Sequence, residues 1–262
     1  MKKNLILKIF VVIAYVAMVI VNYLANALPI GGVTTGEASD SFANLFTPAG
    51  VTFSIWGLIY LLLLGYSVYQ FILRQRKKKM EKTFYLVGIY FIITSIANIL
   101  WIFAWHYGIV WLSVLIMFVL LFYLIKIANV INRKKYSLVD TIFIRLPFSV
   151  YFGWITVATI ANITVFLVSV GWNGFGLSEV VWTIIVLLIG AIIGVGRALK
   201  DKNIFYISVL IWAYAGIWLK HSSVDGFNGE YPGIIMTVII CIIFYLTTIG
   251  FLSYKKLFSK KV

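Results

Sequence analysis

Residues 109–130 read IVWLSVLIMFVLLFYLIKIANV, an apolar run in which Lys126 is the only charged residue. A helix of about 20 apolar residues crosses a hydrocarbon core of roughly 30 Å, whereas the strands of a membrane barrel alternate over about 10 residues. The backbone groups of a lipid-embedded segment must be hydrogen-bonded away from water, and a helix does this within the segment itself. The run therefore predicts a transmembrane α-helix.

Similar runs recur along the whole chain of 262 residues. Hydrophobic residues make up 63% of it and charged residues 11%, and the mean hydropathy is +1.03. This composition leaves too few polar residues to cover a soluble protein of this size. We therefore predict an all-α polytopic membrane protein with eight spans, near residues 5–27, 52–73, 83–105, 109–130, 141–169, 178–196, 203–219 and 233–254.

The first span resembles a signal peptide, because it follows Lys2 and Lys3 and ends at the small residues Ala25 and Ala27. Its apolar run of about 20 residues is longer than the roughly 7–15 residues of a signal peptide. We expect the span to be retained.

Basic residues gather in every second connection between the predicted spans, and acidic residues prevail in the others. Since basic loops stay in the cytoplasm, both termini are expected there, and the predicted location is a bacterial cell membrane. The net charge of +14 lies in short clusters beside spans, where it attracts anionic lipid, so no nucleic-acid partner is expected. The basic residues of these clusters are Lys2, Lys3, Arg74, Arg76, Lys77, Lys78, Lys79, Lys82, Arg133, Lys134, Lys135, Arg197, Lys200, Lys202, Lys255, Lys256, Lys260 and Lys261, whereas the alternate connections contain Glu37, Asp40, Glu179, Asp225 and Glu230, with Lys220 as their basic residue.

The sequence offers little chemistry for catalysis or metal binding. His106 and His221 fall in different outer connections, where a surface position is the default interpretation, and Cys241 is the only cysteine. No nucleophile and base form a pair, so we predict no catalytic residue, no metal and no cofactor, and an enzyme is the less favoured class. Gly190 and Gly194 predict close packing of helices.

Aromatic and asparagine side chains form three stripes with helical spacing, and the nine Trp residues favour the outer half of the spans. Asn98 and Asn162 would be costly in contact with lipid, so their stripes are expected to face the bundle interior. Spacing alone favours core packing over a ligand site for such stripes. The stripes are Phe53, Trp56 and Tyr60; Asn98, Trp101 and Trp105; and Tyr151, Trp154, Ala158 and Asn162.

The connection from Leu28 to Val51 is long for a helical bundle and rich in Gly, Ser and Thr. Long ordered loops are often functional. This loop is either a lid over a site or a slack linker.

Three segments stand in order along the chain, namely FTPAGVTFSIWGLIY at 46–60, NILW at 98–101 followed by WHYG at 105–108, and YFGWITVATIAN at 151–162. Together they resemble the motifs of the TspO/MBR family, the tryptophan-rich sensory or translocator proteins. Two departures are Ser54-Ile55, where the family has Gly-Pro-Val before the Trp, and Pro147, four residues before Tyr151 rather than adjacent to it.

The resemblance implies a five-helix TspO-like bundle plus three additional transmembrane helices. We therefore expect a TspO-like core in residues 1–172 and an added helical region in residues 173–262. It also implies an aromatic pocket that binds a porphyrin-like or sterol-like molecule, with membrane lipid as the surrounding partner, and it leaves a homo-oligomer open. The implied ligand-binding residues are Phe53, Trp56, Tyr60, Asn98, Trp101, Trp105, Tyr151, Trp154, Ala158 and Asn162.

Two other functions compete with this binding or sensory role. One is transport of an apolar or neutral solute, in which the three added spans complete a path. The other is a membrane enzyme acting on a lipid or pigment. Movement of a ligand across vesicles would favour the first, and product formation the second.

Overall fold

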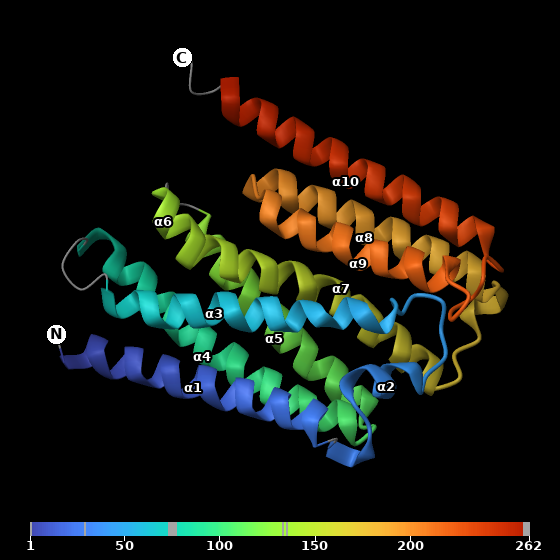
Figure 1. The fold of residues 1–262 in the computed structure, drawn as a ribbon, viewed down its shortest axis with the longest axis horizontal. Helices are drawn as coiled ribbons and strands as arrows, with labels where there is room; N and C mark the ends of the chain where they lie inside the picture. Colours follow the sequence, from blue (N-terminus) through green and yellow to red (C-terminus); the bar gives the residue numbers. More distant parts are fainter. Residues whose placement is uncertain (1, 29, 73–77, 133, 135, 259–262) are drawn as a thin grey trace. The chain divides into compact units, whose positions relative to one another are not determined.

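The computed structural model describes residues 2–28, 30–72, 78–132, 134 and 136–258. Some basic residues of the topology prediction lie outside these ranges, namely Arg74, Arg76, Lys77, Arg133, Lys135, Lys260 and Lys261. The described residues form helices and turns without a strand (Figure 1). The helices are α1 (Lys2–Ala27), α2 (Thr35–Asp40), α3 (Ile55–Ile72), α4 (Lys78–His106), α5 (Val110–Ile131), α6 (Leu138–Asp140), α7 (Leu146–Ser169), α8 (Glu179–Asp201), α9 (Ile204–Ser222) and α10 (Pro232–Phe258), with short 3-10 turns η1 (Ile30–Gly32), η2 (Gly50–Ser54) and η5 (Gly174–Gly176) and a π-helical turn η4 (Thr141–Arg145).

Eight spans are long and apolar enough to cross a membrane within the described ranges, which confirms the predicted all-α multi-pass architecture. They include the run quoted first, which forms α5. The spans are Leu5–Ala27, Gly50–Ile72, Met80–His106, Val110–Ile131, Leu138–Ser169, Glu179–Asp201, Ile204–Ser222 and Pro232–Phe258.

Local sequence signals set the ends of the last three helices. Ser178 caps α8 by accepting a hydrogen bond from Val181 N, and Lys202 ends that helix in the left-handed conformation at φ 48°. Asn203 caps α9 in the same way as Ser178 caps α8. Pro232 starts α10, where its missing N–H costs no helical hydrogen bond.

The chain divides into two compact units that interleave along the sequence. The first unit contains Met1–Ser41 and Ile55–Ile155, and the second contains Phe42–Ser54 and Thr156–Val262. Helix α7 therefore begins in the first unit and ends in the second. The boundary that the sequence suggests between residues 172 and 173 stays a prediction.

Aromatic packing and one asparagine pair hold the first unit together. The buried Tyr66 ring of α3 packs against Phe91 of α4 and Phe148 of α7, with ring centroids 5.8 and 4.7 Å away. Helix α1 lies along α4, and there Asn22 Nδ2 donates to Asn98 Oδ1 over 2.6 Å. Asn98 is fully buried, as its stripe predicts. A hydrogen bond of this kind between membrane helices contributes about 0.6–2 kcal/mol.

Helices α8, α9 and α10 lie side by side in the second unit (Figure 1). Small residues on α8 leave room there for tyrosine side chains of the two neighbouring helices. A Cβ at Gly190 would lie 2.6 Å from the Tyr214 hydroxyl, and one at Gly194 would lie 3.1 Å from the Tyr245 ring. The Tyr214 hydroxyl donates to Leu187 O over 2.7 Å. Gly190 and Gly194 thus serve close helix packing, as predicted.

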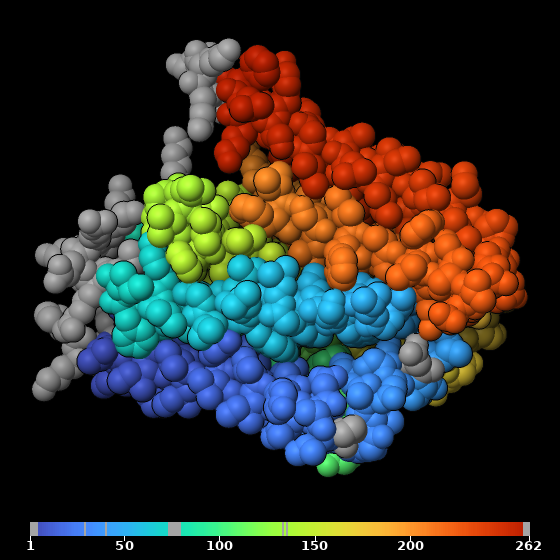
Figure 2. All heavy atoms as spheres, in the orientation of Figure 1, coloured from blue at the N-terminus to red at the C-terminus, as the bar shows by residue number. Residues whose placement is uncertain are grey.

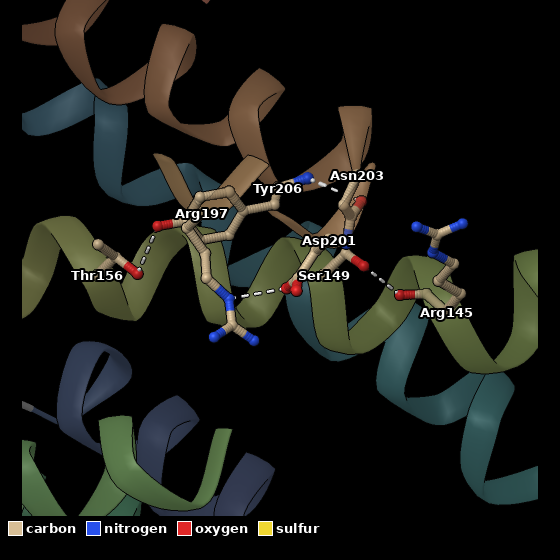
Figure 3. A network of polar contacts seen from close by, with 7 residues as sticks. All are labelled: Arg145, Ser149, Thr156, Arg197, Asp201, Asn203 and Tyr206. Carbon is tan, nitrogen blue, oxygen red and sulfur yellow. Dashed lines mark hydrogen bonds and ion pairs between the residues drawn. The ribbon is translucent and has the colours of Figure 1, made fainter. Parts of the chain in front are cut away.

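Polar contacts in the second unit lie where α8 ends and α9 begins, among the residues Arg197, Asp201, Asn203, Tyr206 and Thr156 that Figure 3 labels. Arg197 Nε donates to Asp201 Oδ2 over 2.7 Å, and the two side chains are 13% and 7% exposed. In the first turn of α9, the Tyr206 hydroxyl donates to Thr156 Oγ1 of α7 over 3.2 Å. These contacts fix the last turn of α8 and join the start of α9 to α7.

Large apolar side chains are exposed on α1 in the first unit and on α10 in the second, the helices drawn in dark blue and red in Figure 2. On α1 these include Phe10 and Ile13, and on α10 Ile243 and Phe244, each about half exposed. Such continuous apolar faces are unusual on a soluble monomer and suit contact with lipid chains. The protein is therefore an integral multi-pass membrane protein.

Candidate functional site

Trp56 forms the centre of an aromatic cluster in the first unit. Its ring stacks on Tyr60 one turn further along α3, with centroids 5.6 Å apart and planes 19° apart. Two rings of α7 meet it edge-on, Tyr151 at 6.0 Å and Trp154 at 6.3 Å. Tyr151 and Trp154 are buried, whereas Trp56 and Tyr60 are half-buried. Helical spacing aligns each pair, since residues three or four apart share a helix face.

Polar atoms within this cluster lack ordinary hydrogen bonds. The hydroxyls of Tyr60 and Tyr151 and the side-chain nitrogen of Asn98 are buried, and none makes a hydrogen bond of normal geometry to the described residues. The Asn98 side chain interacts with the Tyr151 hydroxyl, although not at normal hydrogen-bond geometry. An unsatisfied buried polar group costs about 1–3 kcal/mol, so buried polar atoms that are this poorly paired call for an explanation. A ligand with polar groups would satisfy them.

A second aromatic pair lies on α4. Trp101 stacks on Trp105 with centroids 5.5 Å and planes 18° apart, and both side chains are buried. Trp105 Nε1 donates to Thr35 O of α2 over 3.3 Å. The loop after α1 therefore contacts the helix that carries this pair.

His106 holds the same loop. Its Nδ1 lies 2.9 Å from Ile30 O, and its Nε2 lies 3.1 Å from Thr35 Oγ1. The prediction that both histidines lie on the surface is wrong, because His106 is 6% exposed and His221 is fully buried. Each imidazole pairs with the backbone carbonyl oxygen of a loop residue that is distant in sequence, His106 with Ile30 and His221 with Leu45. Helical spacing cannot reveal such partners.

The connection after α1 is ordered rather than slack in its described residues. Helix α2 begins with a capping box, in which Thr34 Oγ1 accepts from Glu37 N and Glu37 Oε2 accepts from Thr34 N over 2.7 Å. The hydrogen bonds that the Thr34 backbone N–H and, secondly, the Thr34 side chain give to the charged carboxylate lower the pKa of Glu37. Residues 30–41 thus form a short structured segment beside α4.

The remaining predicted site residues lie in the second unit. Phe53 belongs to η2 and is half-buried, while Ala158 and Asn162 lie in the second half of α7. Asn162 is buried, as its stripe predicts. The structure brings together Trp56, Tyr60, Tyr151 and Trp154, and it pairs Trp101 with Trp105.

Sequence reasoning missed three residues near these rings. They are Asn22, which bonds Asn98, and Thr35 and His106, which position the loop beside Trp105. Asn22 carried a usable signal, because an asparagine inside a predicted span is costly unless it is paired. Among the described residues, no group of three or more His, Cys, Asp or Glu side chains could hold a metal ion.

The family relationship comes from comparison with known proteins. The family model of the TSPO-like proteins matches residues 8–251, which extends over the three helices after residue 173 as well as the three motifs. No curated protein and no solved structure matches the chain. The matched region covers most of the sequence and includes both aromatic groups. The chain therefore belongs to the family of TSPO-like proteins.

Proposed function

We propose that the protein binds a flat, hydrophobic, tetrapyrrole-like molecule at the Trp56 cluster as a binding or sensory membrane protein. The observation that carries this proposal is the combination of four aromatic rings with buried polar atoms that lack normal hydrogen bonds. Membership of the TSPO-like family supports a ligand-binding role in the membrane. The sequence motifs of that family include all four rings.

Physical chemistry favours a flat conjugated ligand over a branched apolar one. Aromatic pairs gain about 0.5–1.5 kcal/mol beyond simple area burial when rings stack or meet edge-on. Trp56 and Tyr60 are only half-buried, so part of each side chain remains open to contact with a ligand. The Tyr60 and Tyr151 hydroxyls and the Asn98 amide can donate to carboxylate or carbonyl oxygens of the same ligand.

Protoporphyrin should bind the purified protein saturably. We expect quenching of Trp emission together with a shift of the porphyrin Soret band, both reaching a plateau at one ligand per chain. The matched control is N-acetyltryptophanamide in the same detergent micelles. It shows how much quenching comes only from absorption of light by the porphyrin and from partition of the porphyrin into the detergent. A titration that rises without saturation, as in the control, would remove the support for a tetrapyrrole site.

We also propose that both termini face the cytoplasm of a bacterial cell, because the basic clusters alternate along the chain. In a Cys241→Ala background, a membrane-impermeant maleimide should label Ser41→Cys in intact cells and leave Lys256→Cys unlabelled until the cells are opened. Both positions are exposed in the structure. Labelling of Lys256→Cys alone in intact cells would reverse the orientation.

A further inference from the structure

Residues 42–54, here called the strap, join α2 to α3 and belong to the second unit (Figure 1). Its stretch from Asn44 to Pro48 is buried although it forms no regular secondary structure. Buried irregular backbone is unusual, because its N–H and C=O groups need partners outside a helix or sheet. The partners of the strap therefore indicate what holds it in place.

Some backbone N–H groups of the strap find their hydrogen-bond acceptor within the strap. Asn44 Oδ1 accepts hydrogen bonds from Phe46 N over 3.0 Å and from Thr47 N over 2.9 Å. The next residue is Pro48, which has no N–H to satisfy. The N-terminal part of the strap is thus a preformed turn with a buried Phe46 side chain.

Four further backbone groups of the strap, in Leu45, Ala49 and Thr52, bond to residues of α8 and α9. Leu45 N donates to Glu179 Oε1 over 3.1 Å, at the first residue of α8. Leu45 O accepts from His221 Nε2 over 2.9 Å, and this nitrogen carries the proton because a carbonyl oxygen can only accept. Both backbone groups of Leu45 are therefore satisfied by side chains of the C-terminal region.

Two more hydrogen bonds continue along α9. Ala49 N donates to Gly216 O over 3.0 Å, and Trp212 Nε1 donates to Thr52 O over 2.9 Å. As the strap runs from residue 45 to 52, its partners run back from residue 221 to 212. The strap therefore lies antiparallel to α9 over about 14 Å of helix.

Gly216 permits this close approach. A Cβ at that position would lie 2.0 Å from Thr52 Oγ1 and 2.9 Å from Thr52 Cβ, a backbone-proximal atom that cannot rotate away. His221 is fixed as well, since its ring packs against Phe227 at 4.8 Å and Tyr231 at 5.7 Å. The missing side chain at Gly216 and the fixed ring of His221 therefore give α9 the geometry that it needs to hold the strap.

We infer that α9 is a positioning helix, which holds the strap through Trp212, Gly216 and His221 and thereby fixes the first turn of α3. The strap ends at Ser54, and Trp56 follows two residues later on the same chain. The inference rests on the proposed function in one respect, namely that Trp56 is a wall of the ligand site. It gives the C-terminal helices a role in that site without contact to the ligand.

The test compares Gly216→Ala with Gly196→Ala in the full-length protein. Gly196 lies in α8, and a Cβ added there would meet no atom within 4 Å, so the control has the same chemical change without the clash. Hydrogen exchange is followed by mass spectrometry in the strap and in residues 55–60, and protoporphyrin affinity is measured in parallel. We expect Gly216→Ala to speed exchange in both segments and to weaken binding by about fivefold, roughly the factor for one lost hydrogen bond, whereas Gly196→Ala resembles the native protein.

A second pair of variants covers the case in which Gly216→Ala does not fold. His221→Ala removes the donor to Leu45 O, and His221→Gln restores a side-chain N–H. Exchange in both segments should rise in His221→Ala and return towards native in His221→Gln. Unchanged strap exchange in the folded variants would overturn the inference, as would faster strap exchange with residues 55–60 unaffected.

Failure of the proposed function is recognised separately. If the native protein binds no protoporphyrin, the tetrapyrrole proposal fails, while exchange in residues 55–60 still decides whether α9 positions the start of α3. If the native protein binds and Gly216→Ala loosens both segments without any loss of affinity, the positioning role in the site is refuted and the ligand proposal survives.

Discussion

Trp154→Ala is expected to weaken protoporphyrin binding by about tenfold or more. Trp154 is 3% exposed and meets the Trp56 ring edge-on at 6.3 Å, so its removal takes away one wall of the cluster. The lost aromatic contact is worth about 0.5–1.5 kcal/mol and the lost apolar burial adds to it, while 1.4 kcal/mol already changes affinity tenfold. A titration monitored by the Soret band gives the two dissociation constants.

The matched control for this prediction is Trp111→Ala. Trp111 stands at the start of α5 and is 57% exposed, so the same substitution there removes an indole without opening the cluster. Equal loss of affinity in the two variants, with both folded by circular dichroism, would mean that the cluster is ordinary core packing.

Arg197→Met is expected to lower the free energy of unfolding by about 3 kcal/mol. Exposed ion pairs at this helical spacing contribute only about 0.3–0.5 kcal/mol, but the Arg197 and Asp201 side chains are largely buried. Removing one partner leaves the other charge unpaired in an environment of low dielectric constant, which costs about 3–5 kcal/mol for fully buried pairs. Unfolding in mixed micelles with increasing SDS measures the difference.

Lys200→Met provides the comparison, because Lys200 is exposed in the same last turn of α8. It removes one positive charge and should change the free energy of unfolding by no more than about 0.5 kcal/mol. If Arg197→Met is as stable as Lys200→Met, the ion pair at the end of α8 does not stabilise the fold.

Membrane spans could be predicted from sequence because their cause is local. A run such as residues 109–130 has no stable alternative to a helix in lipid, whatever the rest of the chain does. Burial of Asn98 followed from the same reasoning, since an amide in contact with lipid is costly. These features depend on a segment and its solvent alone.

The histidines and the strap could not be predicted in this way, because their partners are remote backbone atoms. Nothing near His221 in the sequence indicates Leu45 O as its acceptor, which lies 176 residues away. Likewise, helical spacing placed Phe53 on one stripe with Trp56, yet η2 and α3 belong to different units. Periodicity identifies a face of a helix and leaves open which neighbour covers it.

The distance in sequence between the strap and α9 has a consequence for biogenesis. Thr52 and Trp212 are 160 residues apart, and a ribosome adding about 5–20 residues per second needs roughly 8–32 s to bridge that gap. During this time, Leu45, Ala49 and Thr52 have none of their α8 and α9 partners, so the early spans must wait in the membrane with an undocked strap. Damage to α9 should therefore appear in the cell as degradation of an incompletely assembled N-terminal half.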